Sequence, residues 1–202
     1  MAVITRYCHI RKHTLRDDGQ VIFQDTANSL DGFCEEAFRH LGVQYPKFYK
    51  MDRMSKLGIL AVEVLLQRTD SSVRDPESVA VVLSNAHASL DTDLRYFETL
   101  KTIPGPALFV YTLSNIVTGE ICIRHGLKGE NAFFVTPAFE PATITSYVDS
   151  VFSEGKTTSC IAGWIDVLGE QHDVFLYLAE KSQGGNALWT HDAETIQKLY
   201  LS

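Results

Sequence analysis

The sequence predicts an α/β fold with a layered, mostly parallel sheet and buried helices. Short runs of β-branched and other apolar residues alternate with longer segments in which apolar residues recur at helical spacing. Such alternation is typical of parallel sheets, because a parallel connection needs a crossover segment. No repeat, low-complexity segment or long linker interrupts the pattern, so we expect residues 1–202 to form a single domain.

The first third of the chain predicts two strands and a helix. Residues 3–10 have the composition of a strand, and an Asp-Gly pair within residues 16–20 predicts a hairpin turn into a second strand at 21–23. Residues 31–41 carry apolar side chains at helical spacing. Gly42 suits the position just after a helix end.

The middle of the chain predicts three helices and a strand. Residues 53–67 are apolar on nearly every side, which predicts a helix that is buried all round. A β-branched run at 78–84 predicts a central strand, and a helix is expected at 90–100. After a Pro-Gly-Pro break, residues 107–124 predict one further apolar helix that ends before Gly126.

The last third predicts three strands and two helices. Residues 131–136 predict a strand that stops at a proline, and apolar residues within 144–152 mark an amphipathic helix. Two consecutive strands are expected near 158–164 and 174–179, before a closing helix at 193–200.

Composition excludes several classes of function. The 202 residues are 45% hydrophobic and 21% charged, with a formal net charge of −7. Without a basic stripe to displace counterions from phosphates, nucleic-acid binding is not expected. No apolar run approaches the roughly 20 residues of a membrane helix, so no membrane span is expected. The amino terminus lacks the pattern of a secretory signal, which favours the cytoplasm.

Neither a metal site nor a cofactor is predicted. The four cysteines, Cys8, Cys34, Cys122 and Cys160, lie far apart and form no Cys-x-x-Cys pair. Reduced and mostly buried thiols are therefore expected. Neither a phosphate-binding loop nor a dinucleotide fingerprint is found, so no cofactor is assigned.

One stretch carries more specific information. Asn115, Gly119 and Arg124 follow the pattern Asn-x-x-x-Gly-x-Ile-x-x-Arg on a predicted helix, and residues 126–131 read Gly-Leu-Lys-Gly-Glu-Asn. This arrangement resembles the β-ketoacyl synthase family, which has a thiolase-like fold. In that family a similar helix and a Gly-Leu-Lys/Arg-Gly-Pro-Asn turn precede the strand that delivers the nucleophilic cysteine. Glu130 stands here in place of the usual proline.

The resemblance extends from about residue 45 to residue 180, in the order that the family has. Residues 49–57 are similar to its Met-Asp segment and first long helix, and residues 155–164 to the Gly-rich stretch after the nucleophile helix. Ketosynthases look like a duplicated fold of about twice this length. The resemblance therefore implies the amino-terminal half of a thiolase-like fold.

Two departures from the family bear on catalysis. Counted from the Gly-Leu-Lys-Gly turn, the nucleophile position of the family falls on Ala138, whose methyl group cannot accept an acyl chain. The catalytic histidines of the family come from its carboxyl-terminal half, which this sequence does not contain. The resemblance thus implies no catalytic residue and no condensation by this chain alone.

The resemblance is closest to short synthase-like proteins of aryl-polyene and flexirubin-type pathways. Residues 90–93 and 107–113 carry this likeness. Such proteins work beside an active synthase in the manner of a chain-length factor. The implied function is a non-catalytic ketosynthase-like subunit in fatty-acid or polyketide synthesis. Its implied partners are a second copy or a full-length ketosynthase, with acyl carrier protein as a further candidate.

The predicted strand before Ala138 is the implied dimer strand, because in the family this strand pairs across a two-fold axis. It consists of Asn131, Ala132, Phe133, Phe134 and Val135. Its apolar side chains would favour aggregation if the strand were left at an open sheet edge. A partner is therefore expected at this strand.

An acyl-thioester enzyme, a decarboxylase or hydrolase without the condensing cysteine, is the alternative hypothesis. It would need a base and an oxyanion hole near Ala138. Thr136, His87 and Asn85 are the polar candidates for this site. Phe139, next to Ala138, could instead fill the cavity and exclude an acyl chain.

Other polar residues receive structural interpretations. His87 lies in a loop after a strand and is expected to be hydrogen-bonded locally. His125 precedes a glycine at a helix end, where a partly positive imidazole would suit the helix dipole. Asp166, His172 and Asp173 lack the Gly-x-Ser-x-Gly motif that a hydrolase triad would accompany.

Overall fold

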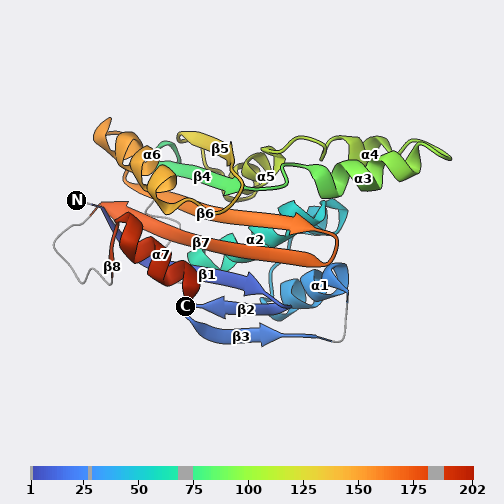
Figure 1. Ribbon diagram of the computed structural model, residues 1–202, viewed down its shortest axis with the longest axis horizontal. Helices are drawn as coiled ribbons and strands as arrows, with labels where there is room; N and C mark the ends of the chain where they lie inside the picture. Colours follow the sequence, from blue (N-terminus) through green and yellow to red (C-terminus); the bar gives the residue numbers. More distant parts are fainter. Residues whose placement is uncertain (1, 27–28, 68–74, 182–188) are drawn as a thin grey trace.

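A single mixed sheet is the centre of the computed structural model, which describes residues 2–26, 29–67, 75–181 and 189–202 (Figure 1). Its strands are β1 (Ala2–Arg11), β2 (Thr14–Asp17), β3 (Gln20–Gln24), β4 (Val79–Asn85), β5 (Asn131–Val135), β6 (Ser159–Leu168), β7 (Gln171–Lys181) and β8 (Trp189–Thr190). Their order is β3-β2-β1-β7-β6-β4-β5, and β8 pairs with β1. Strands from both ends of the chain thus share one sheet.

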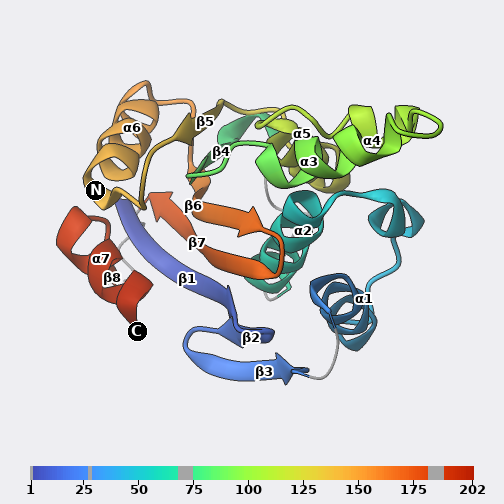
Figure 2. The same ribbon diagram turned by 45° about the vertical axis from the view of Figure 1, so that its right-hand side comes forward.

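The helices pack on both faces of this sheet, which confirms the predicted α/β class. They are α1 (Leu30–His40), α2 (Arg53–Leu66), α3 (Leu90–Thr99), α4 (Pro106–Phe109), α5 (Ile116–His125), α6 (Pro141–Ser153) and α7 (Ala193–Leu201), with short 3₁₀ segments at Pro46–Lys50 and Pro76–Ser78. One core lies between the sheet and α1, α2 and α5. A second core lies between the opposite face and α6 and α7 (Figure 2).

The expectation of mostly parallel strands holds only for β4, β5 and β6. Every other described pair of strands is antiparallel. The cause is local, because two-residue turns join β1 to β2, β2 to β3 and β6 to β7, and such turns connect only antiparallel strands. Asp18 and Gly19 form the predicted hairpin turn, with φ of 47° and 81°.

The helix predicted over residues 107–124 is wrong as a single element. The chain forms α4 and α5 instead, with turns between them over residues 110–115. Thr112 and Ser114 belong to the residue types whose hydroxyl groups compete for backbone hydrogen bonds. The Thr112 hydroxyl donates to the Phe109 carbonyl over 2.8 Å.

Helix α2 is the buried helix that the sequence predicts. All of its residues from Met54 to Leu65 are buried. Gly58 permits its close approach to α5, because a Cβ at this position would lie 2.5 Å from Val117 Cγ2. Asp52 caps the start of the helix by accepting the Ser55 N–H over 3.0 Å.

Candidate functional site

The carboxyl ends of the parallel strands bring the predicted site segments to one edge of the sheet. Asn85, the last residue of β4, is in register with Val135, the last residue of β5. The Thr136 N–H donates to the Asn85 carbonyl over 2.9 Å. The loops that follow β4 and β5 therefore begin side by side. In open α/β sheets, ligands bind outside the carboxyl ends of parallel strands.

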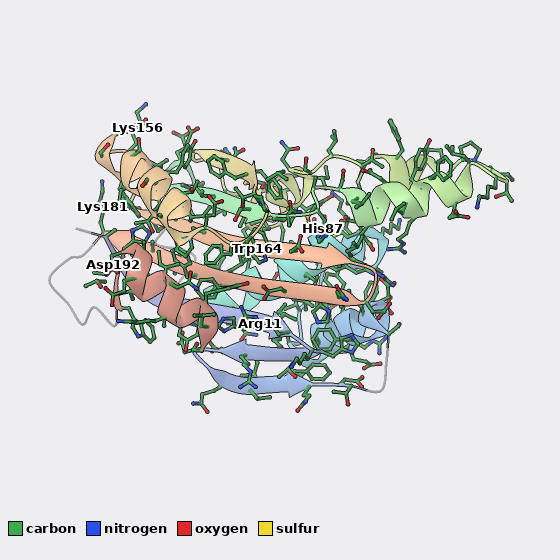
Figure 3. All side chains as sticks on the ribbon, in the orientation of Figure 1. Arg11, His87, Lys156, Trp164, Lys181 and Asp192 are labelled. Atoms are coloured by element: carbon green, nitrogen blue, oxygen red, sulfur yellow. The ribbon has the colours of Figure 1, made fainter. Side chains whose placement is uncertain are left out.

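His87 lies at this edge (Figure 3), where it meets Asp166. His87 Nδ1 lies 2.8 Å from Asp166 Oδ2. The second carboxylate oxygen accepts the backbone N–H groups of Ala86 and His87 over 3.0 and 3.1 Å. The His87 side chain is 38% exposed and that of Asp166 is 17% exposed. Sequence reasoning placed His87 in a loop with local hydrogen bonds but missed Asp166 as its partner.

Asn85 serves the loop and does not face a ligand site. Its side chain is fully buried. The Asn85 amide donates to the Ala88 carbonyl over 2.8 Å, and its oxygen accepts the Ala88 N–H over 3.0 Å. These bonds hold Ala88 at a φ of 49°, a left-handed conformation that is uncommon for residues other than glycine. The amide thus positions the backbone that carries His87.

Ala138 is exposed and contributes no polar side-chain atom. Next to it, the Thr136 hydroxyl donates to the Ala138 carbonyl over 2.8 Å. No hydrogen bond joins Thr136 to His87 or Asp166 in the described part of the chain. Of the three predicted polar candidates, only His87 therefore presents a group that could take part in chemistry.

Phe139 lies in the second core. It is buried, and its ring centroid is 4.7 Å from that of Tyr200 and 5.7 Å from that of Phe175. Trp164 lies 6.0 Å away on β6. The ring therefore fills space between the sheet and α7.

The edge of β5 is open. Among the described strands, β5 pairs only with β4. Phe133 and Phe134 are partly buried, and Val135 is 54% exposed. Beside the strand, a groove of about 550 Å³ runs along α6 and is lined by Phe134, Ala142, Thr143, Ser146, Tyr147 and Ser150.

A second apolar surface lies on the arm, which we define as residues 90–113 with α3 and α4. The arm extends beyond the sheet in both ribbon views (Figures 1 and 2). Phe97, Ile103 and Phe109 are 61, 83 and 58% exposed. The other exposed large apolar residues of the arm are Leu90, Leu94, Leu100, Val110 and Leu113. Leu90, Leu94 and Phe97 recur at helical spacing, which predicts a helix but does not show that these side chains are exposed.

The other residues considered in the sequence analysis have structural roles. Gly126 ends α5 in the left-handed conformation, as predicted. Burial lowers the pKa of His125, which disfavours the partly positive imidazole expected at this helix end. His172 stacks on His13 at a centroid distance of 5.1 Å, and Asp173 binds Arg11. Asp166, His172 and Asp173 thus form no common site.

The cysteines lie away from the site. Cys122 is on α5 and Cys160 on β6, and all four thiols are free. Burial raises the pKa of Cys34 to about 12 and that of Cys160 well above its usual range. No group of three or more potential metal ligands occurs in the described ranges. None of the helices in those ranges is long and apolar enough to cross a membrane.

Comparison with known proteins places the fold. No protein family and no curated protein matches the sequence. Solved structures do match, among them the ishigamide ketosynthase/chain length factor, with a TM-score of 0.66 and 17% identity over 92% of this chain. The chain has a ketosynthase fold. It spans 63% of the matched chain in that structure.

Two further ketosynthase structures resemble this chain. A type II polyketide synthase acyl-carrier protein in complex with its ketosynthase, AntDE:AntF, matches with a TM-score of 0.61, 16% identity and coverage of 89% of this chain and 62% of that chain. The ketosynthase ApeO in complex with its chain length factor ApeC, from Xenorhabdus doucetiae, matches with a TM-score of 0.57 and 12% identity. This last match covers 98% of this chain and 90% of that chain.

Proposed function

We propose that the protein is a non-condensing ketosynthase-like subunit that pairs with an active β-ketoacyl synthase. In this role it acts as a chain length factor does, in fatty-acid or polyketide synthesis of the aryl-polyene kind. The observation that carries the proposal is the open apolar edge of β5 in a chain with a ketosynthase fold. The proposal includes a single domain and a cytoplasmic location.

The absence of a nucleophile supports a non-condensing role. The resemblance puts Ala138 at the position of the nucleophile, and this residue is exposed without any reactive group. Cys122 and Cys160 lie on other elements, and burial raises the pKa of both thiols. Since the thiolate is the reactive form of cysteine, neither is suited to hold an acyl chain.

Two surfaces support a protein partner. The edge of β5 and the arm leave apolar side chains exposed, and such patches mark interaction sites or aggregation hazards. The match to the ApeO–ApeC structure covers 90% of a chain there, so a ketosynthase fold of similar length occurs within that complex. A full-length ketosynthase is therefore the partner we favour, and acyl carrier protein is a further candidate from the AntDE:AntF complex.

Pairing through β5 can be tested at Val135. Val81 N–H donates to the Glu130 carbonyl, and Thr136 N–H to the Asn85 carbonyl. Because residues of a parallel strand alternate in their direction of bonding, the backbone of Val135 points to the open edge. Val135→Pro removes one outward donor and leaves the β4 ladder intact. We expect at least tenfold weaker association with the ketosynthase, measured by native mass spectrometry.

Val135→Thr is the matched control, because it keeps a β-branched side chain and the backbone donor. It should bind the ketosynthase as the natural chain does. Equal binding by the proline variant would rule out pairing through this edge.

A further inference from the structure

The groove along α6 continues the open edge of β5. Phe134 lines the groove from β5, and its ring meets that of Tyr147 of α6 edge-on, with the ring centroids 5.1 Å apart. Side chains alternate along a strand, so Ala132 and Phe134 face the second core and α6, whereas Phe133 faces the first core. A strand that pairs with β5 extends both faces of the sheet past this edge. The partner then has to cover the α6 side of the added strand, directly beside the groove.

Helix α6 presents small side chains to this groove. Ala142, Ser146 and Ser150 are exposed and recur at every fourth residue, so they lie on one face of the helix. This face is about 12 Å long at a rise of about 1.5 Å per residue. None of the described lining residues is charged. Because small side chains let a second helix approach closely, the groove fits the apolar face of an amphipathic helix.

The rim of the groove is acidic. Glu140 precedes the first turn of α6, Glu154 follows its last turn, and Glu130 precedes β5. All three are exposed, and none forms an ion pair with another described residue. Burial and the charges of Glu130 and Glu154 raise the pKa of Tyr147, as expected for two carboxylates close to its hydroxyl group. Lys156 lies beyond the end of α6, outside the groove lining (Figure 3).

We propose that this groove holds an amphipathic helix of the ketosynthase partner, with small or apolar side chains on its buried face and Lys or Arg along its flanks. The inference rests on the proposed function, which supplies the partner at β5, and it adds the place and the chemistry of a second contact. Opposite charges speed association and exclude partners of like charge. A second copy of this chain does not fit, because a two-fold axis would bring a second acidic rim against the first.

Binding of the full chain to the purified ketosynthase, measured by native mass spectrometry, tests the shape of the groove. Ser146→Trp fills the middle of the groove and should weaken binding at least tenfold. Ser146→Ala keeps the side chain small and should bind as the natural chain does. Because Ser146 is exposed and its side chain bonds to no other described residue, both variants should fold, which circular dichroism checks.

The rate of association with the ketosynthase tests the charge of the rim. Glu154→Lys should slow association about threefold or more at low salt, and the difference should shrink as the salt concentration rises. Glu36→Lys is the matched control, since it makes the same change in net charge on α1, which packs on the opposite face of the sheet. This control should associate as the natural chain does.

Equal binding by Ser146→Trp and the natural chain would overturn the inference, and so would equal association rates for Glu154→Lys and Glu36→Lys. Pairing with the ketosynthase persists in both cases, so the proposed function would stand. Self-association that Ser146→Trp abolishes would assign the groove to a second copy and likewise overturn the inference. A natural chain that does not pair with the ketosynthase at all would contradict the proposed function together with this inference.

Discussion

The β2–β3 hairpin and the α3–α4 arm both extend from the body, but the chain itself covers most apolar side chains of the hairpin and leaves most of those of the arm exposed. Phe23 of β3 packs against Phe33 of α1 at a centroid distance of 5.8 Å. Asp17 of β2 forms a buried ion pair with Arg6. The arm, in contrast, exposes Phe97 and most of its other large apolar residues.

The difference shows which of the two regions needs another molecule to cover its apolar side chains. Exposed apolar patches mark interaction sites or aggregation hazards, so we expect a partner to cover the arm. The hairpin is stabilised by contacts that this chain supplies. The arm is anchored at its two ends, where Thr92 donates to Asp52 over 2.9 Å and Tyr111 donates to Glu120 over 3.1 Å.

The largest expected effect is at Phe33 of α1, which packs against the hairpin. Phe33→Ala removes a fully buried ring between the sheet and α1, and we expect the free energy of unfolding to fall by about 3–5 kcal/mol. Denaturant titration monitored by circular dichroism measures this change. A loss below about 1 kcal/mol would show that the hairpin region is not the tightly packed part of the molecule.

A pH effect of intermediate size is expected at His9 on β1. Burial lowers the pKa of His9 to about 4, so the folded state binds its proton less readily than the unfolded state does. The contribution of His9 to the free energy of unfolding should therefore be greatest above about pH 6.5, and the free energy should fall by about 3 kcal/mol as the pH drops to 4. His9→Gln should remove this part of the pH dependence. An unchanged pH profile in that variant would assign the effect to other groups.

The smallest effect on stability is expected on the arm. Phe97→Ser replaces an exposed ring, so the free energy of unfolding should change by less than about 0.5 kcal/mol. The same variant should bind a ketosynthase partner at least tenfold more weakly, since the partner would cover this ring. Thermal unfolding and native mass spectrometry of one sample measure both quantities. A large loss of stability without a loss of binding would show that Phe97 stabilises the fold and is not covered by the partner.

The sequence predicts those parts of the fold that are determined by neighbouring residues, such as tight turns. The Asp18–Gly19 turn is predictable because both residues tolerate positive φ. The turn at Lys12 and His13 has the same backbone conformation, with φ of 48° and 52°, but its residues give no such signal. Without this turn in the prediction, β2 and its antiparallel pairing with β1 could not be foreseen.

The site is less predictable because its partners are distant in sequence. His87 and Asp166 are 79 residues apart, and their meeting depends on β4 and β6 being neighbours in the sheet. Periodicity does indicate both strands, but it does not give their order. The exposure of the arm is unpredictable for a similar reason. Apolar residues at helical spacing give the same sequence pattern whether the chain itself or a partner covers them.

Condensation by a mixture of this chain and a full-length ketosynthase tests the central claim most directly. The account predicts one copy of each chain in the complex by native mass, with carbon–carbon bond formation that is lost when the nucleophilic cysteine of the ketosynthase is replaced by alanine. Ala138→Cys in this chain should not restore that activity. Condensation by this chain alone, or a failure to join the ketosynthase at micromolar concentration, would contradict the account.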